Sequence, residues 1–411
     1  MNTEDEENIM LVVKKFGGTS VGNAERIQNV ANRIAKEYRS GNDVVVVLSA
    51  MGKMTDVLID QAKELNPNPP KREMDMLFTI GEQQSVALMA MALDAIGIPA
   101  VSLNAFQVAM HTTKIYGNAR LKKIETERIR HELESKKVVI VTGFQGINKF
   151  DDYTTLGRGG SDTTAVALAA ALHADKCEIY TDVDGVFTAD PRIVKNAFKL
   201  DEITYDEMLD LATLGAGVLH NRSVEMAKKY GVQLVVRSSL NESEGTVLKE
   251  EVEVERMLIS GVALDKNVAR ISVMGLKDEP GIAFKLFDCL AKAGINVDVI
   301  LQSIGRDGTK DITFTVERNE ADNAVKAIHA QKARITLQDI TVNKAVNKIS
   351  IVGAGMMSNP GVAAKMFEAL YNVGVNINMI STSEIRVTVI VDEGKAEKAM
   401  NAVHDAFMNV E

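Results

Sequence analysis

Two segments in the C-terminal third of the chain repeat one another. From Ile271 and again from Ile349 the chain reads an apolar strand, a turn that ends in Pro-Gly, an amphipathic helix and a second strand, predicted at 294–300 and 374–380. The matching residues, at one constant spacing, are Pro280/Pro360, Gly281/Gly361, Lys285/Lys365, Phe287/Phe367, Leu290/Leu370, Gly294/Gly374, Asn296/Asn376 and Ser303/Ser383. A constant spacing over this many positions marks an internal duplication. Each copy continues with an alternating strand and another helix, so we predict two ferredoxin-like β-α-β-β-α-β modules.

The N-terminal part has a different pattern, in which strands and helices alternate. The runs at 9–13, 43–48 and 138–142, which are apolar apart from Asp43 and Thr142, are typical of strands buried on both faces. Helix patterns follow these runs, which predicts a mainly parallel, three-layer α/β domain. We also expect a helix over 72–96 that is interrupted at 79–85. There Glu82 is either part of a cap between two helices or a ligand for an amine.

Two glycine-rich stretches are candidates for binding an anion. The first, Gly157-Arg158-Gly159-Gly160-Ser161-Asp162, directly precedes an apolar helix pattern. Bare backbone N–H groups at a helix start suit an anion. A turn with Ser161 or Asp162 as its N-cap is the simpler interpretation. Arg158 beside Asp162 favours a binding site, because a turn alone requires neither side chain.

The second stretch, Lys15-Phe16-Gly17-Gly18-Thr19-Ser20, follows the first predicted strand. It lacks both the P-loop order and the three-glycine dinucleotide pattern, because its lysine precedes the glycines. Lys15 is therefore placed either over a ligand on the Gly17–Gly18 backbone or on the surface beside a turn.

Composition limits the remaining possibilities. The 411 residues predict two to three domains, and the net charge of −9 argues against a nucleic-acid binder. Cys177 and Cys289 are isolated, so no disulfide framework is implied. The polar, acidic start has no apolar signal core, and we find no apolar run of membrane-spanning length. We therefore expect a cytoplasmic protein.

The repeated modules themselves suggest a small ligand. Pro-Gly at a helix start leaves backbone donors free, and Asn296 and Asp298 add an amide and a carboxylate. An amino acid would use such donors for its carboxylate and such acceptors for its amine. Two packing modules that only dimerise fit the spacing equally well.

Taken together, these motifs resemble those of the aspartate kinases, in the amino-acid-kinase superfamily, followed by two ACT regulatory modules. The motifs that carry the resemblance are Lys15–Ser20, Gly81-Glu82, Gly157–Asp162, Thr181-Asp182-Val183-Asp184-Gly185 and Ile380-Ser381-Thr382-Ser383-Glu384. The resemblance implies an amino-acid-kinase catalytic domain at 1–250 and ACT modules at 257–340 and 341–411. It implies phosphorylation of the L-aspartate side chain with Mg-ATP to 4-phospho-L-aspartate, at the start of lysine, threonine and methionine synthesis. It also implies inhibition at the ACT modules by lysine, threonine or both.

The resemblance also assigns roles to residues. Lys15 is expected to neutralise the moving phosphoryl group, and Asp162 to orient Lys15. The substrate residues are Ser49, Thr55, Glu82 for the α-amine, Arg158 for the α-carboxylate, Gly159, Gly160 and Ser161. The nucleotide residues are Lys15, Phe16, Gly17, Gly18, Thr181, Asp182, Phe187 and Arg192. The effector residues are Asp278, Asn296, Val297, Asp298, Gln302, Asn376 and Ile377. No residue is assigned as a dedicated protein ligand of a metal ion.

The acceptor chemistry agrees with this assignment. A carboxylate with a pKa of about 3.9 is already ionised at neutral pH, so no general base is required. Two positions depart from the family pattern, because Phe187 stands where Tyr is common and Gly217 replaces a Lys of some members.

Three further points follow from the resemblance. We expect a homo-oligomer formed through the ACT modules. Met257 is either an internal start of a separate regulatory chain or a buried methionine. The alternatives to this function are a catalytically silent amino-acid sensor and a sibling kinase with another acceptor, such as glutamate, acetylglutamate, carbamate or UMP.

Overall fold

The computed structural model describes residues 9–215, 217–252, 258–304, 308–331, 333–357 and 359–408, so Met257 lies outside the described residues. Within these ranges the chain forms two compact units. The first holds the residues up to Val186, together with Lys199–Ala212 and Gly217–Val252. The second holds Phe187–Phe198, residues 213–215 and the described residues from 258 onward.

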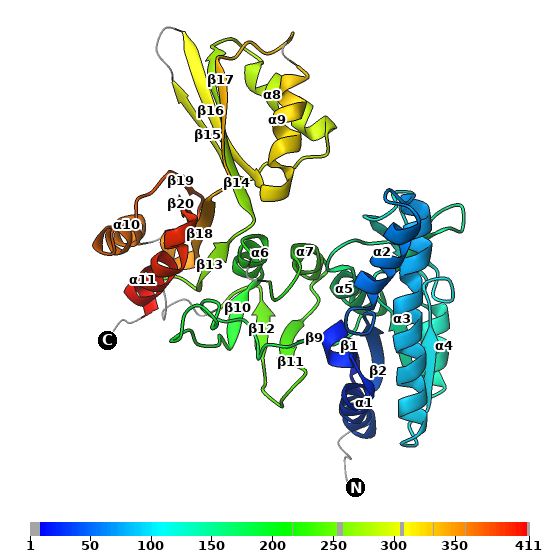
Figure 1. The fold of residues 1–411 in the computed structure, drawn as a ribbon. Helices are drawn as coiled ribbons and strands as arrows, with labels where there is room; N and C mark the ends of the chain where they lie inside the picture. Colours follow the sequence, from blue (N-terminus) through cyan, green and yellow to red (C-terminus); the bar gives the residue numbers. More distant parts are fainter. Residues whose placement is uncertain are drawn as a thin grey trace. The chain divides into compact units, whose positions relative to one another are not determined.

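The first unit is built on an eight-stranded sheet in the order β10-β12-β11-β9-β1-β2-β6-β3 (Figure 1). The strands from β11 to β3 in this order are parallel, whereas β12 is antiparallel to β11. The carboxyl ends of the parallel strands therefore meet at one edge, where open α/β sheets bind ligands. The strands are β1 (Leu11–Phe16), β2 (Asp43–Leu48), β3 (Ala100–Leu103), β6 (Val138–Thr142), β9 (Lys176–Thr181), β10 (Glu202–Thr204), β11 (Leu234–Ser238) and β12 (Thr246–Lys249).

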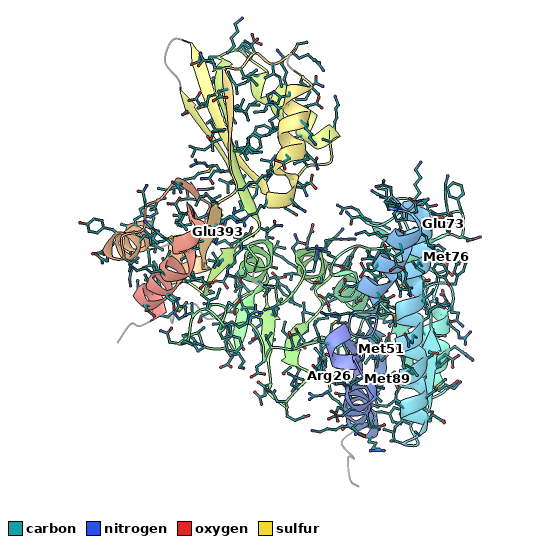
Figure 2. All side chains as sticks on the ribbon, in the orientation of Figure 1. Arg26, Met51, Glu73, Met76, Met89 and Glu393 are labelled. Atoms are coloured by element: carbon teal, nitrogen blue, oxygen red, sulfur yellow. The ribbon has the colours of Figure 1, made fainter. Side chains whose placement is uncertain are left out.

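Helices cover both faces of this sheet. One face packs against α1 and α3 through a shared core that includes Ile34 and Met89, the latter labelled in Figure 2. The α5 helix contacts β1, β2 and β9. Every residue from Val44 to Leu48 is buried, so this valine-rich strand packs against the helices on both faces of the sheet, as predicted. The helices are α1 (Ala24–Arg39), α2 (Met54–Leu65), α3 (Lys71–Asp94), α4 (Glu127–Glu134), α5 (Gly160–Leu172), α6 (Tyr205–Thr213) and α7 (Asn221–Tyr230), with the 3₁₀ turn η1 (Gly18–Val21).

The interruption predicted within the long helix is wrong. The α3 helix runs without a break through Gly81 and Glu82. A glycine is accommodated there because the helix passes close to another segment: a Cβ on Gly81 would lie 2.7 Å from Cβ of Ala50. By length and composition α3 could cross a membrane, although Glu82, Gln83 and Gln84 interrupt its apolar residues. In this unit it packs against β3, β6 and β8 (Tyr153–Thr155), as a core helix does.

A second, small sheet was not predicted from the sequence. It has the order β5-β4-β7-β8, with the strands β4 (Met110–Thr112), β5 (Leu121–Ile124), β7 (Gln145–Ile147) and β8 (Tyr153–Thr155). These strands are only three or four residues long, which is too short for a periodic pattern to show. Since β8 leads directly into Gly157–Asp162, this sheet fixes one end of the glycine-rich loop.

The second unit contains the two duplicated modules. The first module has the predicted order, with β14 (Val268–Lys277), α8 (Ile282–Lys292), β15 (Ile300–Ile304), β16 (Thr309–Glu317), η3 (Arg318–Glu320), α9 (Ala321–His329) and β17 (Asp339–Asn343). The second has β18 (Val346–Val352), η4 (Ala354–Met357), α10 (Val362–Asn372), β19 (Met379–Thr382), β20 (Arg386–Asp392), η5 (Glu393–Lys395) and α11 (Ala396–Met408). The mixed α/β first unit and the ferredoxin-like modules confirm the predicted fold class.

Two details of the modules differ from the prediction. The fourth strand of the second module is β13 (Gly261–Asp265), which precedes the first module and pairs antiparallel with β18. This pairing covers an edge of β18 that would otherwise be exposed. The second predicted strands also begin later than expected, at Ile300 and Met379. Asn296 and Asp298 consequently lie in a loop before β15 and not on a strand.

The two modules are joined by apolar and charged contacts. Val268 and Val299 of the first module pack with Val346, Met379 and Ile390 of the second. Arg318 forms an ion pair with Glu393 (2.9 Å), which is labelled in Figure 2. The modules therefore form one body that shares a core.

Candidate active site

Two adjacent lysines of β1 point to opposite faces of the large sheet. Lys14 pairs with Glu37 of α1, whereas Lys15 pairs with Asp162 of α5. In the second pair, Nζ of Lys15 lies 2.6 Å from Oδ1 of Asp162, and each side chain is 12% exposed. The structure therefore brings together the two residues predicted to be catalytic, at the carboxyl end of β1.

The glycine-rich loop is shaped by two left-handed residues. Gly157 and Gly159 have φ angles of 79° and 65°, which glycine adopts without strain. A side chain on Gly159 would also overlap His220, so the position requires glycine for a second reason. The α5 helix begins at Gly160, so Asp162 lies in its first turn and not at the N-cap. A carboxylate is stabilised there by the helix dipole.

Arg158 is the exposed cation of this loop. Among the residues that the structure describes, no group hydrogen-bonds to its guanidinium or forms an ion pair with it. The planar guanidinium fork therefore remains available to a carboxylate.

Two serines join the loop to the end of β2. Oγ of Ser49 lies 3.0 Å from Oγ of Ser161, and the Ser49 carbonyl accepts a hydrogen bond from Ser85 Oγ (2.8 Å). Thr55, in the first turn of α2, is half-buried. The carboxyl ends of β1 and β2 and the start of α5 thus form one continuous polar surface.

Glu82 is a buried acid beneath this surface. Its side chain accepts hydrogen bonds from the backbone N–H of Ala50 (3.3 Å) and from Gln145 Nε2 (3.2 Å), and the residue is 3% exposed. Burial raises the pKa of Glu82 to about 7, because the hydrogen bonds only partly offset the desolvation of the charge. Glu82 is therefore poised to change charge near neutral pH.

Sequence reasoning missed Asp75, a second buried acid on α3. It accepts hydrogen bonds from the backbone N–H of Gly117 (2.9 Å) and from the N–H and hydroxyl of Thr155 (3.0 and 2.7 Å). Burial raises its pKa. The signal was present in the spacing, because Asp75, Thr79, Glu82, Val86 and Met89 share one helical face. Two acidic residues on the buried face of one helix are expected to position the groups that bond to them.

The two glycines after Lys15 differ in their surroundings. A Cβ on Gly18 would lie 2.6 Å from the carbonyl oxygen of Ala50, so this residue must be small for packing. Gly17 has space, and its nearest neighbour would be Nζ of Lys15 at 3.6 Å. Gly17 therefore leaves open backbone beside the Lys15 ammonium. Phe16 is fully buried, which excludes a direct role for its side chain at this surface.

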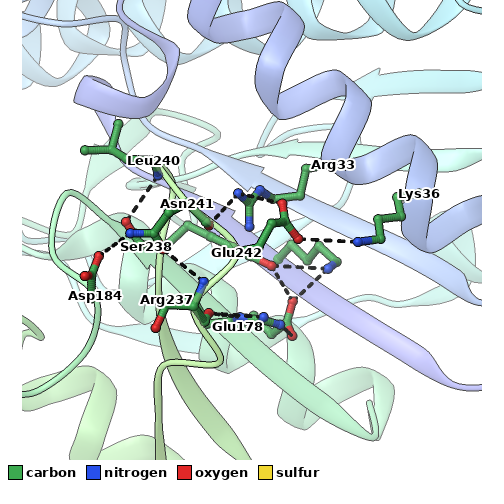
Figure 3. A network of polar contacts seen from close by, with 12 residues as sticks. Arg33, Lys36, Glu178, Asp184, Arg237, Ser238, Leu240, Asn241 and Glu242 are labelled. Carbon is green, nitrogen blue, oxygen red and sulfur yellow. Dashed lines mark hydrogen bonds and ion pairs between the residues drawn. The ribbon is translucent and has the colours of Figure 1, made fainter. Parts of the chain in front are cut away.

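The residues predicted on the nucleotide side are divided between the units. Thr181 ends β9, and its hydroxyl donates to the exposed Asp182 (3.2 Å). Asp184 in the same turn accepts from Asn241 (2.7 Å; Figure 3). Phe187 and Arg192 belong to the second unit, where Arg192 forms a bidentate pair with Asp190.

A separate network of ion pairs, drawn in Figure 3, is centred on the buried carboxylate of Glu178. Glu178 contacts Lys14 (2.7 Å), Arg237 (3.1 Å) and Tyr180 (2.9 Å). Burial alone would raise the pKa of Glu178, but the attraction of Lys14 outweighs it and the pKa is held at about 2. The network borders a cavity of about 490 Å³ between α1 and residues 239–242. Because the charges of this network are paired with one another, they indicate a structural role.

The predicted effector residues lie in the second unit. Asp278 pairs with Lys310 (2.7 Å), and Asp298 pairs with Lys348 of β18. Gln302 lies on β15, and Asn296, Val297, Asn376 and Ile377 lie in the loops before β15 and β19. The structure therefore joins Asp298 to the second module through a lysine that the sequence did not single out.

The chain is similar to known proteins in sequence and in fold. Residues 10–238 match the amino acid kinase family, and residues 271–331 and 349–407 match the ACT domain. The chain is 52% identical over 398 residues to an aspartokinase of Bacillus sp. (strain MGA3), covering 97% of each chain. It is similar to the crystal structure of E. coli aspartokinase III with aspartate and ADP in the R-state, with 25% identity, a TM-score of 0.84 and coverage of 97% and 100%. The T-state of that protein, with lysine and aspartate, gives a TM-score of 0.76 at 25% identity and the same coverage.

Proposed function

Since the chain belongs to the aspartokinases of the amino acid kinase family and is an enzyme that phosphorylates aspartate under allosteric control, we propose that Lys15, Asp162 and Arg158 are central to its active site. The observation that carries this proposal is the Lys15–Asp162 ion pair beside Arg158, which has no partner among the described residues. The product is 4-phospho-L-aspartate, a mixed anhydride of a carboxylate and phosphate.

Lys15 supplies charge for the transfer. Phosphoryl transfer depends mainly on positioning and on neutralising the charge of the moving group. Asp162 holds the Lys15 ammonium in place from the start of α5. The open backbone at Gly17 allows a phosphate to approach within reach of the same ammonium. The aspartate side chain is already ionised, so the site needs no general base.

Arg158 and Glu82 recognise the ends of the amino acid. The Arg158 fork matches a carboxylate bidentately and is assigned to the α-carboxylate. Glu82 is assigned to the α-amine, because an arriving ammonium would favour its charged form. Ser49, Thr55 and Ser161, with the backbone of Gly159 and Gly160, complete the substrate side.

ATP is the phosphoryl donor, and we assign Mg²⁺ to its phosphates. Among the described residues, no group of three His, Cys, Asp or Glu side chains is placed to hold a metal ion. Mg²⁺ commonly uses only one or two carboxylates together with substrate phosphates. The exposed carboxylate of Asp182 at the end of β9 fits this requirement. When bound, the ion neutralises phosphate charge, and Thr181, Phe187 and Arg192 complete the nucleotide side.

The regulatory proposal concerns the second unit. We assign the effector to Asp278 and the loops that carry Asn296–Asp298 and Asn376–Ile377, with Gln302. The effector is lysine, threonine or both, end products of the pathway that the reaction opens. Self-association through the ACT modules and a cytoplasmic location complete the proposal.

Initial-rate kinetics test the function. Acyl phosphate formed from ATP and aspartate is trapped with hydroxylamine. Release of ADP compares glutamate, acetylglutamate, carbamate and UMP as acceptors, because the product from UMP is not an acyl phosphate. We expect turnover with aspartate and inhibition when lysine and threonine are added separately or together. Preference for another acceptor would overturn the substrate assignment, and no response to either amino acid would overturn the effector assignment.

A further inference from the structure

Residues 187–198 fold as part of the second regulatory module, although they lie in the middle of the kinase sequence. Ala189 and Val194 are buried in the same apolar core as Val262 of β13 and Val403 and Phe407 of α11. The chain reaches this segment from Val186, whose N–H is bonded to Thr246 Oγ1 (2.8 Å) within the first unit. A short piece of chain thus joins the turn after β9 to the core of the module.

Thr188 attaches this segment to both β13 and α11. Its carbonyl accepts from the N–H of Val262 (2.8 Å), its N–H donates to the Phe198 carbonyl (3.0 Å), and its hydroxyl lies 2.9 Å from Nε2 of His404 on α11. Thr188 and His404 are both fully buried. A buried imidazole whose partner is lost retains its desolvation cost, so this contact strongly favours one position of the segment.

Two amide side chains extend the same attachment. Asn401 of α11 donates to the Ile193 carbonyl (3.2 Å), and Asn196 donates to Asp405 of α11 (2.8 Å). Together with His404, they hold the segment at three points along one helix. Arg192, which is bonded to Asp190, lies on the exposed side.

We propose that His404 is a positioning residue for the nucleotide: through Thr188 it holds the segment that carries Phe187 and Arg192, so the second module sets the affinity for ATP. This proposal rests on the nucleotide roles assigned above to Phe187 and Arg192. Phe187 directly precedes Thr188, and Arg192 lies in the same segment. A change in α11 is thereby transmitted to Phe187 and Arg192 through the 187–198 segment.

The test uses the full-length chain and two ways of breaking the contact. Thr188→Val keeps the shape but removes the hydroxyl, and His404→Phe removes the ring nitrogens. We expect each to weaken ADP binding in calorimetry and to raise the KM for ATP about 5- to 30-fold, the range of a buried hydrogen bond. We expect kcat and the KM for aspartate to change by less than about twofold. The double variant should be no worse than either single variant, and His404→Gln, which can bond to Thr188, should recover most of the affinity.

A matched control separates positioning from loss of stability. Thr388 bonds to Ser350 (2.7 Å) elsewhere in the same module and is equally buried, so Thr388→Val removes a comparable hydroxyl. Its ADP affinity should equal that of the unmodified chain. Unchanged ADP binding in both Thr188→Val and His404→Phe, or equal weakening in Thr388→Val, would overturn the proposal. Since ADP binding is measured without turnover, a missing aspartate kinase activity would refute the proposed function while this test still decides the inference.

Discussion

Nζ of Lys15 lies 2.6 Å from Oδ1 of Asp162, which joins the end of β1 to the first turn of α5. Both side chains are largely buried, yet the pair lies beside the open backbone of Gly17 and the exposed Arg158. A cation held this firmly beside open backbone provides charge without reorganisation during the reaction.

Replacing Lys15 should therefore abolish catalysis without unfolding the protein. We expect Lys15→Met to lower kcat by about 10³-fold, the typical loss when a preorganised electrostatic group is removed. ADP and aspartate should still bind, because most of their contacts remain. Hydroxamate formation measures the rate, and calorimetry measures binding; a kcat within tenfold of the unmodified enzyme would contradict the role.

The neighbouring lysine provides the control. Lys14 is buried between Glu37 and Glu178 on the opposite face of β1. Lys14→Met leaves buried carboxylates with fewer cations and should cost about 3 kcal/mol in the free energy of unfolding. The folded fraction should retain its activity. Rate measurements should thus assign a catalytic role to Lys15, and urea unfolding should assign a structural role to Lys14.

Arg158 should govern aspartate affinity alone. A charged, bidentate hydrogen bond contributes about 1.5–3 kcal/mol, so Arg158→Gln should raise the KM for aspartate about 10- to 100-fold. Arg158→Lys should recover only part of this loss, because an ammonium lacks the fork. The KM for ATP and the melting temperature should not change, since the side chain is exposed and makes no described bond. A parallel rise in both KM values would indicate a general distortion of the loop instead.

The limits of sequence reasoning can be seen in particular elements. The strand at Asp43–Leu48 was predictable because burial on both faces leaves a continuous valine run. The pairing of β13 with β18 was not, because it joins segments on either side of a whole module and neither strand encodes its partner. The Lys15 and Asp162 motifs could be found, whereas the partners Gln145 of Glu82 and Lys348 of Asp298 could not. Those contacts depend on tertiary packing, which leaves no local pattern in the amino-acid sequence.

Glu82 should make aspartate binding depend on pH. Its pKa of about 7 means that the carboxylate able to receive an ammonium forms only as the pH rises through neutrality. The KM for aspartate should therefore fall between pH 6 and pH 8, on the usual scale of about tenfold per pH unit below the pKa. In Glu82→Gln the KM should be high and independent of pH in this range. A pH dependence that survives in Glu82→Gln would assign the titration to another group.

The same variant should be more stable in alkaline solution. The folded pKa of Glu82 lies above its unfolded value, so its contribution to stability is present below the unfolded pKa and is lost as the pH rises to about 7. Glutamine carries no charge to bury, and Glu82→Gln should gain up to about 3 kcal/mol at pH 8 and little at pH 4. Urea unfolding at the two pH values measures this gain. Equal free energies of unfolding for Glu82→Gln and the unmodified protein at pH 8 would show that burial does not destabilise the charged form of Glu82.

Lys348 should transmit the effector signal between the modules. Its side chain is 4% exposed and contacts Asp265 of β13 (3.3 Å) and Asp298 of the proposed effector loop. Lys348→Met frees Asp298 from the second module, so we expect the effector concentration for half-inhibition to rise about tenfold while the uninhibited rate is kept, a coupling loss of about 1.4 kcal/mol. The exposed pair of Lys344 with Asp322 (2.8 Å) offers the control, since Lys344→Met removes a lysine from the strand connection before β18 without touching the loop. Initial rates with lysine and threonine compare the variants. Inhibition that is unchanged in Lys348→Met, or equally weakened in Lys344→Met, would show that the buried lysine only stabilises the fold.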